Sequence, residues 1–264
     1  MATAHVGAVT IHYEIEGEDA APPLLLLNSL GTSLEMWNDQ LPELRRHFKV
    51  VRYDVRGHGR SSLSDTDHYE MATLGGDALA VLDAARIPIA HWCGLSLGGM
   101  TAMWAAVHQR ERMARLALCN TSAHMPPPAL WQSRIELVER EGMAAIADSV
   151  VQRWFTAEFR AASPDRVERI RQMLLTQAPR GYAAACRAIR DMDQREEVLR
   201  ITAPTLIIGG SKDPATPVEH SSLLHARILG SRFKLLDAAH LSNVEQPTEF
   251  CAAILEFFCE GKPQ

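Results

Sequence analysis

Short apolar runs alternate with amphipathic stretches along most of the chain. The runs are rich in Leu, Val and Ile, which is typical of buried strands. They are residues 23–27, 48–53, 87–93, 113–119, 203–210 and 232–236. Helical spacing or helix-forming composition falls between them, at residues 41–44, 74–85, 99–107 and 248–258, and residues 6–16 alternate as in a β-hairpin. Strands that alternate with helices predict an α/β fold, in which a mostly parallel sheet is covered by helices on both faces.

The interval 122–200 breaks this alternation. It opens on Met125 and three prolines, which exclude regular structure at that point. Trp131, Ile135 and Val138 then fall on one helical stripe, and no convincing strand precedes Thr205. We therefore expect residues 1–121 and 201–264 to form the α/β core, and residues 122–200 to form an all-helical cap over the active site.

A G-x-S-x-G pentapeptide centred on Ser96 lies between an apolar run and a stretch of helix formers. This strand–turn–helix context is the one in which the pattern forms a nucleophile elbow. Glycines two residues before and after the serine fit, because bulky side chains would collide across so tight a bend. The alternative is a glycine-rich turn whose serine only caps the next helix. The flanking sequence favours a serine nucleophile.

A nucleophilic serine needs a histidine base and an acid that orients the histidine. In chain order after Ser96, Asp213 follows the apolar run 203–210, and His240 follows the run 232–236. Asp237 is a rival acid, although its position three residues before His240 suits a turn better. Ser242 and Glu245 have the spacing of a helix-capping box just after the histidine. The predicted catalytic residues are Ser96, Asp213 and His240.

An oxyanion hole requires two backbone N–H groups that face the developing charge. One should come from Leu97, the residue after the nucleophile, and the other from the loop 28–33 after an early strand. Leu30 is the expected second donor, with Gly31 as the alternative. Ser29 could instead orient the loop through its hydroxyl.

Composition narrows the class of protein further. The 264 residues carry a net charge of −5 and are 47% hydrophobic, which disfavours an electrostatic nucleic-acid interface and indicates one globular core. The beginning of the chain lacks the features of a signal peptide, and no apolar run has membrane-spanning length. The five cysteines are widely spaced and lie mostly inside apolar segments, so we expect reduced thiols in a cytoplasmic protein. No metal-ligand spacing or phosphate loop is present, and we expect no cofactor.

Several motifs resemble the α/β-hydrolase fold family along nearly the whole chain. They are Asp54-x-Arg56-Gly57-His58-Gly59-x-Ser61, the segment Gly94–Gly99, and the placement of Asp213 and His240. More narrowly, three segments resemble 3-oxoadipate enol-lactonases of aromatic catabolism. These segments are residues 28–32 with Trp37, residues 153–156, and residues 181–189.

The narrower resemblance implies hydrolysis of a carboxylate-bearing enol-lactone to 3-oxoadipate. A general carboxylesterase or perhydrolase, or a carbon–carbon bond hydrolase of the same fold, would share the catalytic residues. Ser96 disfavours dehalogenases and epoxide hydrolases of this fold, which need a carboxylate nucleophile. Both an acyl-enzyme route and direct activation of water by His240 fit the residues, and the sequence is silent on oligomeric state.

A substrate carboxylate should meet a local cation in a chain of negative net charge. Arginine suits this role because its planar guanidinium binds a carboxylate through two hydrogen bonds. Arg134 lies three residues after Trp131, at the edge of the apolar stripe that we expect to face the site. The alternative is an exposed arginine paired with a neighbouring glutamate. We expect Arg134 to bind the carboxylate and Trp131 to line the pocket.

Overall fold

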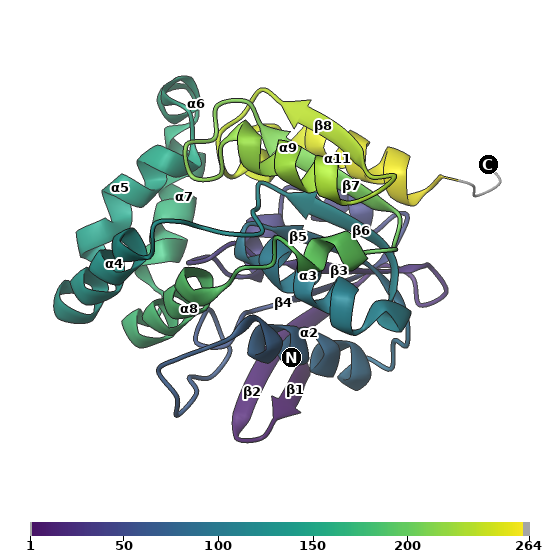
Figure 1. Cartoon of the computed structure of the whole chain (residues 1–264), viewed down its shortest axis with the longest axis horizontal. Coiled ribbons are helices and arrows are strands. Elements are labelled where there is room, and N and C mark those ends of the chain that lie inside the picture. Colours follow the sequence, from purple (N-terminus) through teal and green to yellow (C-terminus); the bar gives the residue numbers. More distant parts are fainter. Residues whose placement is uncertain (1, 261–264) are drawn as a thin grey trace.

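One eight-stranded sheet organises the protein, whose computed structural model describes residues 2–260 (Figure 1). Its spatial order is β1-β2-β4-β3-β5-β6-β7-β8. The strands are β1 (Ala2–Val6), β2 (Val9–Glu16), β3 (Pro23–Leu27), β4 (Lys49–Tyr53), β5 (Ala90–Leu95), β6 (Met113–Cys119), β7 (Thr205–Gly210) and β8 (Arg232–Leu236). Strand β2 pairs antiparallel with β1 and β4, and all other pairs are parallel. The mostly parallel sheet is confirmed. A hairpin is present as well, but it spans residues 2–16 instead of the predicted 6–16, with its turn between Val6 and Val9.

Helices cover the sheet because of the order in which the strands are laid down. The chain moves outward from β3 to β4, then reverses past β3 to β5, β6, β7 and β8. Right-handed crossovers in opposite directions place their helices on opposite faces of the sheet. The helices packed on the sheet are α1 (Leu41–Leu44), α2 (Met71–Ala84), α3 (Leu97–His108), α9 (Val218–Arg227) and α11 (Pro247–Phe258). Short helices η1 (Leu34–Trp37), η2 (Arg110–Arg112), η3 (Glu197–Arg200) and α10 (Ser242–Glu245) complete this part.

Two further predicted boundaries are wrong by three residues. Strand β5 begins at Ala90 instead of Ile87, because Arg86 has a positive φ of 57° and Pro88 has no N–H to donate to a neighbouring strand. Helix α2 begins at Met71, three residues before the expected start. Neither shift moves a candidate site residue.

Five helices form the insertion between β6 and β7. They are α4 (Pro128–Glu141), α5 (Ala144–Trp154), α6 (Ala157–Ala162), α7 (Pro164–Leu175) and α8 (Pro179–Asp191). Figure 1 shows them grouped beside one end of the sheet. Ile135 and Val138 are fully buried and α4 packs against α8, so this part of the stripe serves the insertion's own packing.

The hydrophobic core is continuous through the sheet and the insertion. Leu24, Leu25, Leu26 and Leu27 are all fully buried, as expected for a strand covered on both faces. Each such leucine stabilises the fold by about 1.5–3 kcal/mol. The five cysteines are free, and no helix among residues 2–260 has the length and apolarity needed to cross a membrane.

Candidate active site

Ser96 occupies the bend between β5 and α3. Its φ of 56° and ψ of −116° lie outside the regions that a side-chain-bearing residue favours. A Cβ on Gly94 would lie 2.3 Å from the carbonyl oxygen of Gly98, and one on Gly98 would lie 2.2 Å from that of Leu27. Both positions therefore need glycine. The Ser96 N–H donates to the carbonyl of Cys119 at 2.9 Å, which holds the strained turn against β6.

Asp213 and His240 are brought together from the loops that follow β7 and β8. The His240 Nδ1 lies 2.8 Å from the Asp213 Oδ2, and both residues are buried. Since an ionised carboxylate only accepts hydrogen bonds, the histidine donates from Nδ1, which leaves Nε2 as its basic nitrogen. Burial alone would raise the pKa of Asp213. The charge of His240 and hydrogen bonds from His240, Asn120 and Thr216 outweigh burial and hold that pKa below its usual value.

Asn120 is a site residue that the sequence analysis missed. It follows β6, is fully buried and has a positive φ of 43°. Its side-chain amide donates to the Asp213 Oδ2 at 3.0 Å and to the carbonyl of Ala239 at 3.1 Å. One side chain therefore joins the loop of the acid to the loop of the histidine. Its place at the carboxyl end of a central strand was the available signal.

Asp237, the rival acid, lies outside this network. Its side chain is 71% exposed and forms an ion pair with the Lys212 ammonium at 3.0 Å. Hydrogen bonds from Lys212 and Ser211 lower the pKa of Asp237. This carboxylate therefore belongs to the surface, whereas Asp213 contacts the imidazole.

The capping box predicted after His240 is wrong. Helix α10 begins at Ser242, but the Ser242 hydroxyl donates to the Asn120 Oδ1 at 2.6 Å instead of capping the helix. Glu245 accepts the N–H of Ala239 at 3.0 Å and hydrogen bonds from the N–H and hydroxyl of Thr156. These tertiary bonds replace the local ones and fix the loop that carries the histidine.

A cavity of about 370 Å³ joins Ser96 and His240 to the insertion. Leu30 lines it, and Leu97 is the first residue of α3, directly after Ser96. Among residues 2–260, neither the Leu30 nor the Leu97 backbone N–H has a hydrogen-bond partner. Gly31 does not line the cavity. These placements favour Leu30 over Gly31 as the second oxyanion donor.

Trp131, Arg134 and Arg153 line the same cavity from helices α4 and α5. The Arg134 guanidinium lies 4.8 Å from the centre of the Trp131 ring, and the indole N–H donates to the carbonyl of Met125 at 3.0 Å. Within residues 2–260, neither arginine forms an ion pair with a carboxylate, so the expected alternative of a glutamate partner for Arg134 is wrong. Arg153 is a residue that we did not single out from the sequence.

The two guanidinium groups influence each other. Burial, and next the positive charge of Arg134, lower the pKa of Arg153. Two like charges beside one half-buried cavity repel each other unless an anion lies between them. The cavity is therefore electrostatically suited to a carboxylate. No group of His, Cys, Asp and Glu side chains suited to hold a metal is present in the described part of the chain.

The sheet order, the bend at Ser96 and the Asp213–His240 pair define a hydrolase class. The family model for the alpha/beta hydrolase fold matches residues 22–247, and the chain belongs to this family. Within the family, it is 39% identical to 3-oxoadipate enol-lactonase 2 of Acinetobacter baylyi over 246 residues, which are 93% of this chain and 92% of that protein.

Comparison with solved structures places the chain in the same family. An enol-lactonase from Burkholderia xenovorans superimposes with a TM-score of 0.96 at 39% identity, covering 98% of this chain and all of that one. A thermophilic esterase from Thermogutta terrifontis, solved with malate bound, has a TM-score of 0.92 at 29% identity and covers 98% of each chain. The α/β-hydrolase fold that the sequence predicts is confirmed.

Proposed function

We propose that this protein opens an enol-lactone that bears a carboxylate, converting 3-oxoadipate enol-lactone to 3-oxoadipate in aromatic compound catabolism. The observation that carries the substrate class is the pair Arg134 and Arg153, which line the cavity that holds Ser96 and His240 and have no carboxylate partner among residues 2–260. The similarity to two Acinetobacter enol-lactonases, at 39% and 38% identity, supports the same reaction.

In the proposed mechanism, Ser96 is the nucleophile and His240 is its base. His240 Nε2 takes the proton of the Ser96 hydroxyl while the serine oxygen attacks the carbonyl carbon of the lactone. The ring C–O bond breaks, and the leaving group is an enolate that stays tethered to the acyl-enzyme. The proton that His240 took from Ser96 passes to the enolate carbon, which gives the ketone and returns His240 to its neutral form. The ring can then no longer close. Water then attacks the acyl group with His240 as base and releases the serine.

Asp213 and two backbone amides stabilise the charges that form. Asp213 keeps Nδ1 protonated and stabilises the imidazolium, because its low pKa keeps the carboxylate ionised at neutral pH. The N–H groups of Leu30 and Leu97 bind the oxyanion. A donor of this kind contributes about 3–4 kcal/mol, since the charge it binds exists only in the transition state.

The insertion is the proposed cap. Residues 122–200 would cover the site, with Trp131 lining the pocket and the two arginines holding the substrate carboxylate. The partner is then a small molecule and not a nucleic acid, in keeping with the net charge of −5. The free, mostly buried cysteines support a cytoplasmic location.

Substrate profiling tests the proposal directly. Synthetic 3-oxoadipate enol-lactone should be turned over with a kcat/KM at least about a hundredfold above that of neutral alkyl esters. Ser96→Ala, purified in parallel, controls for contaminating esterase. Equal or faster hydrolysis of simple esters would identify a general carboxylesterase instead.

A further inference from the structure

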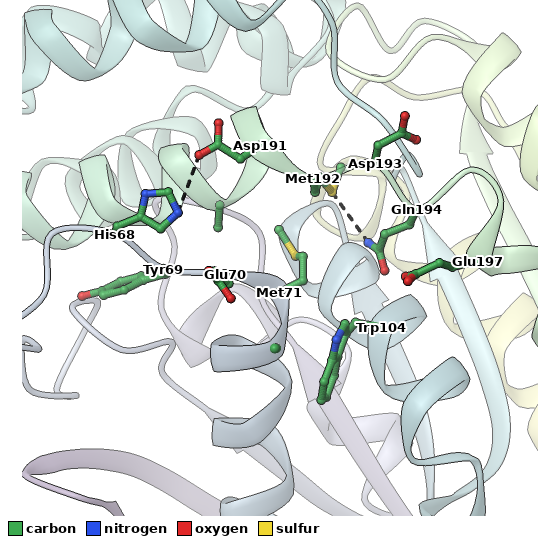
Figure 2. A pocket seen from close by; sticks show the side chains of 12 residues that line it. His68, Tyr69, Glu70, Met71, Trp104, Asp191, Met192, Asp193, Gln194 and Glu197 are labelled. Atoms are coloured by element: carbon green, nitrogen blue, oxygen red, sulfur yellow. Dashed lines mark hydrogen bonds and ion pairs between the residues drawn. The ribbon is translucent and has the colours of Figure 1, made fainter.

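A second cavity, of about 310 Å³, lies beside the segment through which the chain returns from the insertion to the sheet. Its walls come from the start of α2, from α3, and from the segment that runs from the end of α8 into η3 (Figure 2). It shares no lining residue with the cavity that contains Ser96. Nothing in the proposed reaction uses it.

The charges around this cavity are acidic. Four carboxylates line it, those of Glu70, Asp191, Asp193 and Glu197. Two of them are already neutralised, because Asp191 pairs with Arg190 and Asp193 pairs with Arg195, at 2.7 and 2.6 Å.

The other two carboxylates have no permanent counter-ion. Within the described range 2–260, Glu70 and Glu197 have no lysine or arginine partner. The charged group nearest to Glu197 is the His108 ring, whose Nε2 lies 4.0 Å from the carboxylate. The cavity therefore presents two carboxylates that no lysine or arginine among residues 2–260 neutralises.

Gln194 gives an independent indication of a ligand. It is 4% exposed and lines the cavity. Its amide nitrogen donates to the carbonyl of Met100 at 3.0 Å, which fixes the orientation of the amide. The amide oxygen is buried and has no hydrogen-bond partner within residues 2–260. Figure 2 shows this oxygen pointing toward the Trp104 side of the cavity, where a bound donor would satisfy it.

Apart from the His68 ring, which lies 3.6 Å from Asp191, the rest of the lining is mostly apolar. Met71, Met192 and the half-buried ring of Trp104 supply most of it. The cavity volume is far larger than a bare metal ion needs, and no metal-ligand cluster is present among residues 2–260. A ligand that fits must combine a compact positive charge, several N–H donors and an apolar body.

We propose that this cavity binds a small primary organic ammonium ion with a short apolar body. The ammonium carries three N–H donors, which suit the unpaired Gln194 oxygen, and its charge suits the carboxylates that line the cavity. The apolar body packs on the methionine and tryptophan side chains. This assignment goes beyond the proposed hydrolysis and does not depend on it.

Such a ligand would lie where the insertion joins the sheet. The Gln194 N–H donates to the carbonyl of Ala123 at 2.8 Å, and His124 pairs with Asp193 as an isolated antiparallel bridge. The outgoing and returning connections of the insertion therefore meet beside the cavity. A ligand that contacts both α3 and the returning connection would stabilise this junction, so binding should raise the melting temperature.

Calorimetric titration of the full chain with 2-phenylethylammonium tests the proposal. We expect one saturable site with a Kd of about 1 mM or tighter, and no comparable heat from 2-phenylethanol, a neutral molecule of the same shape. Glu197→Gln and Glu70→Gln should each weaken binding about fivefold or more. Glu196→Gln is the matched control, because Glu196 is adjacent in sequence but pairs with Arg227 at 2.8 Å outside this cavity. It should change the Kd less than twofold.

Further readouts separate this site from the catalytic one. Gln194→Met should weaken binding as well, and the kcat/KM of Glu197→Gln for esters should stay within about twofold of the parent. The proposal is overturned if no saturable binding is seen, if the neutral alcohol binds equally well, or if Glu196→Gln weakens binding as much as Glu197→Gln. In that case the Gln194 oxygen is satisfied by water alone.

Discussion

Removing the two cavity arginines one at a time gives the sharpest test of substrate recognition. We consider Arg134→Met, Arg153→Met and the double variant. Methionine keeps an unbranched apolar side chain of similar reach, so packing on Trp131 is largely retained while the charge is lost. Arg140→Met is a matched control, because Arg140 lies on the same helix, is exposed, and pairs with Glu141.

The expected magnitude follows from the environment of the pair. A charge-assisted hydrogen bond between a half-buried guanidinium and a carboxylate is worth about 1.5–3 kcal/mol, which corresponds to about 10- to 150-fold in kcat/KM. Because the positive charges of Arg134 and Arg153 repel each other, deleting one of them removes an unfavourable interaction. The melting temperature should therefore stay constant or rise slightly. If both groups bind the same carboxylate, the double variant should depart from additivity by about 0.5 kcal/mol or more.

The assay compares two substrates that differ only in charge. They are the enol-lactone with its free carboxylate and the same lactone with that carboxylate methylated. Each single variant should lose activity on the acid and retain it on the methyl ester within about twofold, and Arg140→Met should retain both. Equal losses on the two substrates would refute the reasoning and show that the arginines only support the helices around the cavity.

The remaining predictions concern the catalytic residues and one buried histidine. Ser96→Ala should abolish hydrolysis without loss of folding, as read by circular dichroism; activity within tenfold of the parent would exclude Ser96 as nucleophile. Asp213→Asn should lower kcat by about 10⁴-fold with a smaller change in KM, whereas Asp237→Asn, on the surface, should be silent; the reverse result would assign the acid to Asp237. Burial lowers the pKa of His58 from 6.5 to about 4, so the unfolded chain binds this proton first as the pH falls. The free energy of unfolding should consequently drop by up to about 3 kcal/mol between pH 6.5 and 4, as measured by urea denaturation at each pH. His58→Gln should show a smaller drop over this range. A variant whose pH dependence coincides with that of the parent would contradict this assignment.

The fold and the positions of the site residues could be predicted because they rest on local patterns and chain order. The pentapeptide around Ser96 demands a strand, a turn and a helix, and the apolar runs before Asp213 and His240 supply the strands that carry them. Apolar periodicity also located every strand of the sheet except β1, of which only Val6 fell inside the predicted hairpin. Such signals are contained in short stretches of sequence. A strand or helix can therefore be predicted from them without knowing which other elements it packs against.

What could not be predicted depends on contacts between distant segments. Nothing in the local sequence separates Asn120 from any other asparagine that follows a strand. Its role arises only because Asp213 and the carbonyl of Ala239 both lie within hydrogen-bond distance of its side-chain amide. Arg153 is distinguished from most other arginines by its position on the cavity that holds Ser96, which only the folded chain defines. Ser242 has the local spacing of a cap, yet a tertiary partner competes successfully for its hydroxyl.

The bonds made by Glu245 bear on how this enzyme can be re-engineered. Its carboxylate joins Thr156, in the insertion, to the backbone beside His240, and the N–H of Leu241 donates to the carbonyl of Trp154 at 3.0 Å. The insertion is thus not an exchangeable module, although it occupies one continuous stretch of sequence. A chimaera that receives the helices of a relative without a hydrogen-bonding residue at position 156 would leave Glu245 half unsatisfied and the catalytic histidine poorly anchored. Successful transplants should carry Trp154 and Thr156 with the recipient core.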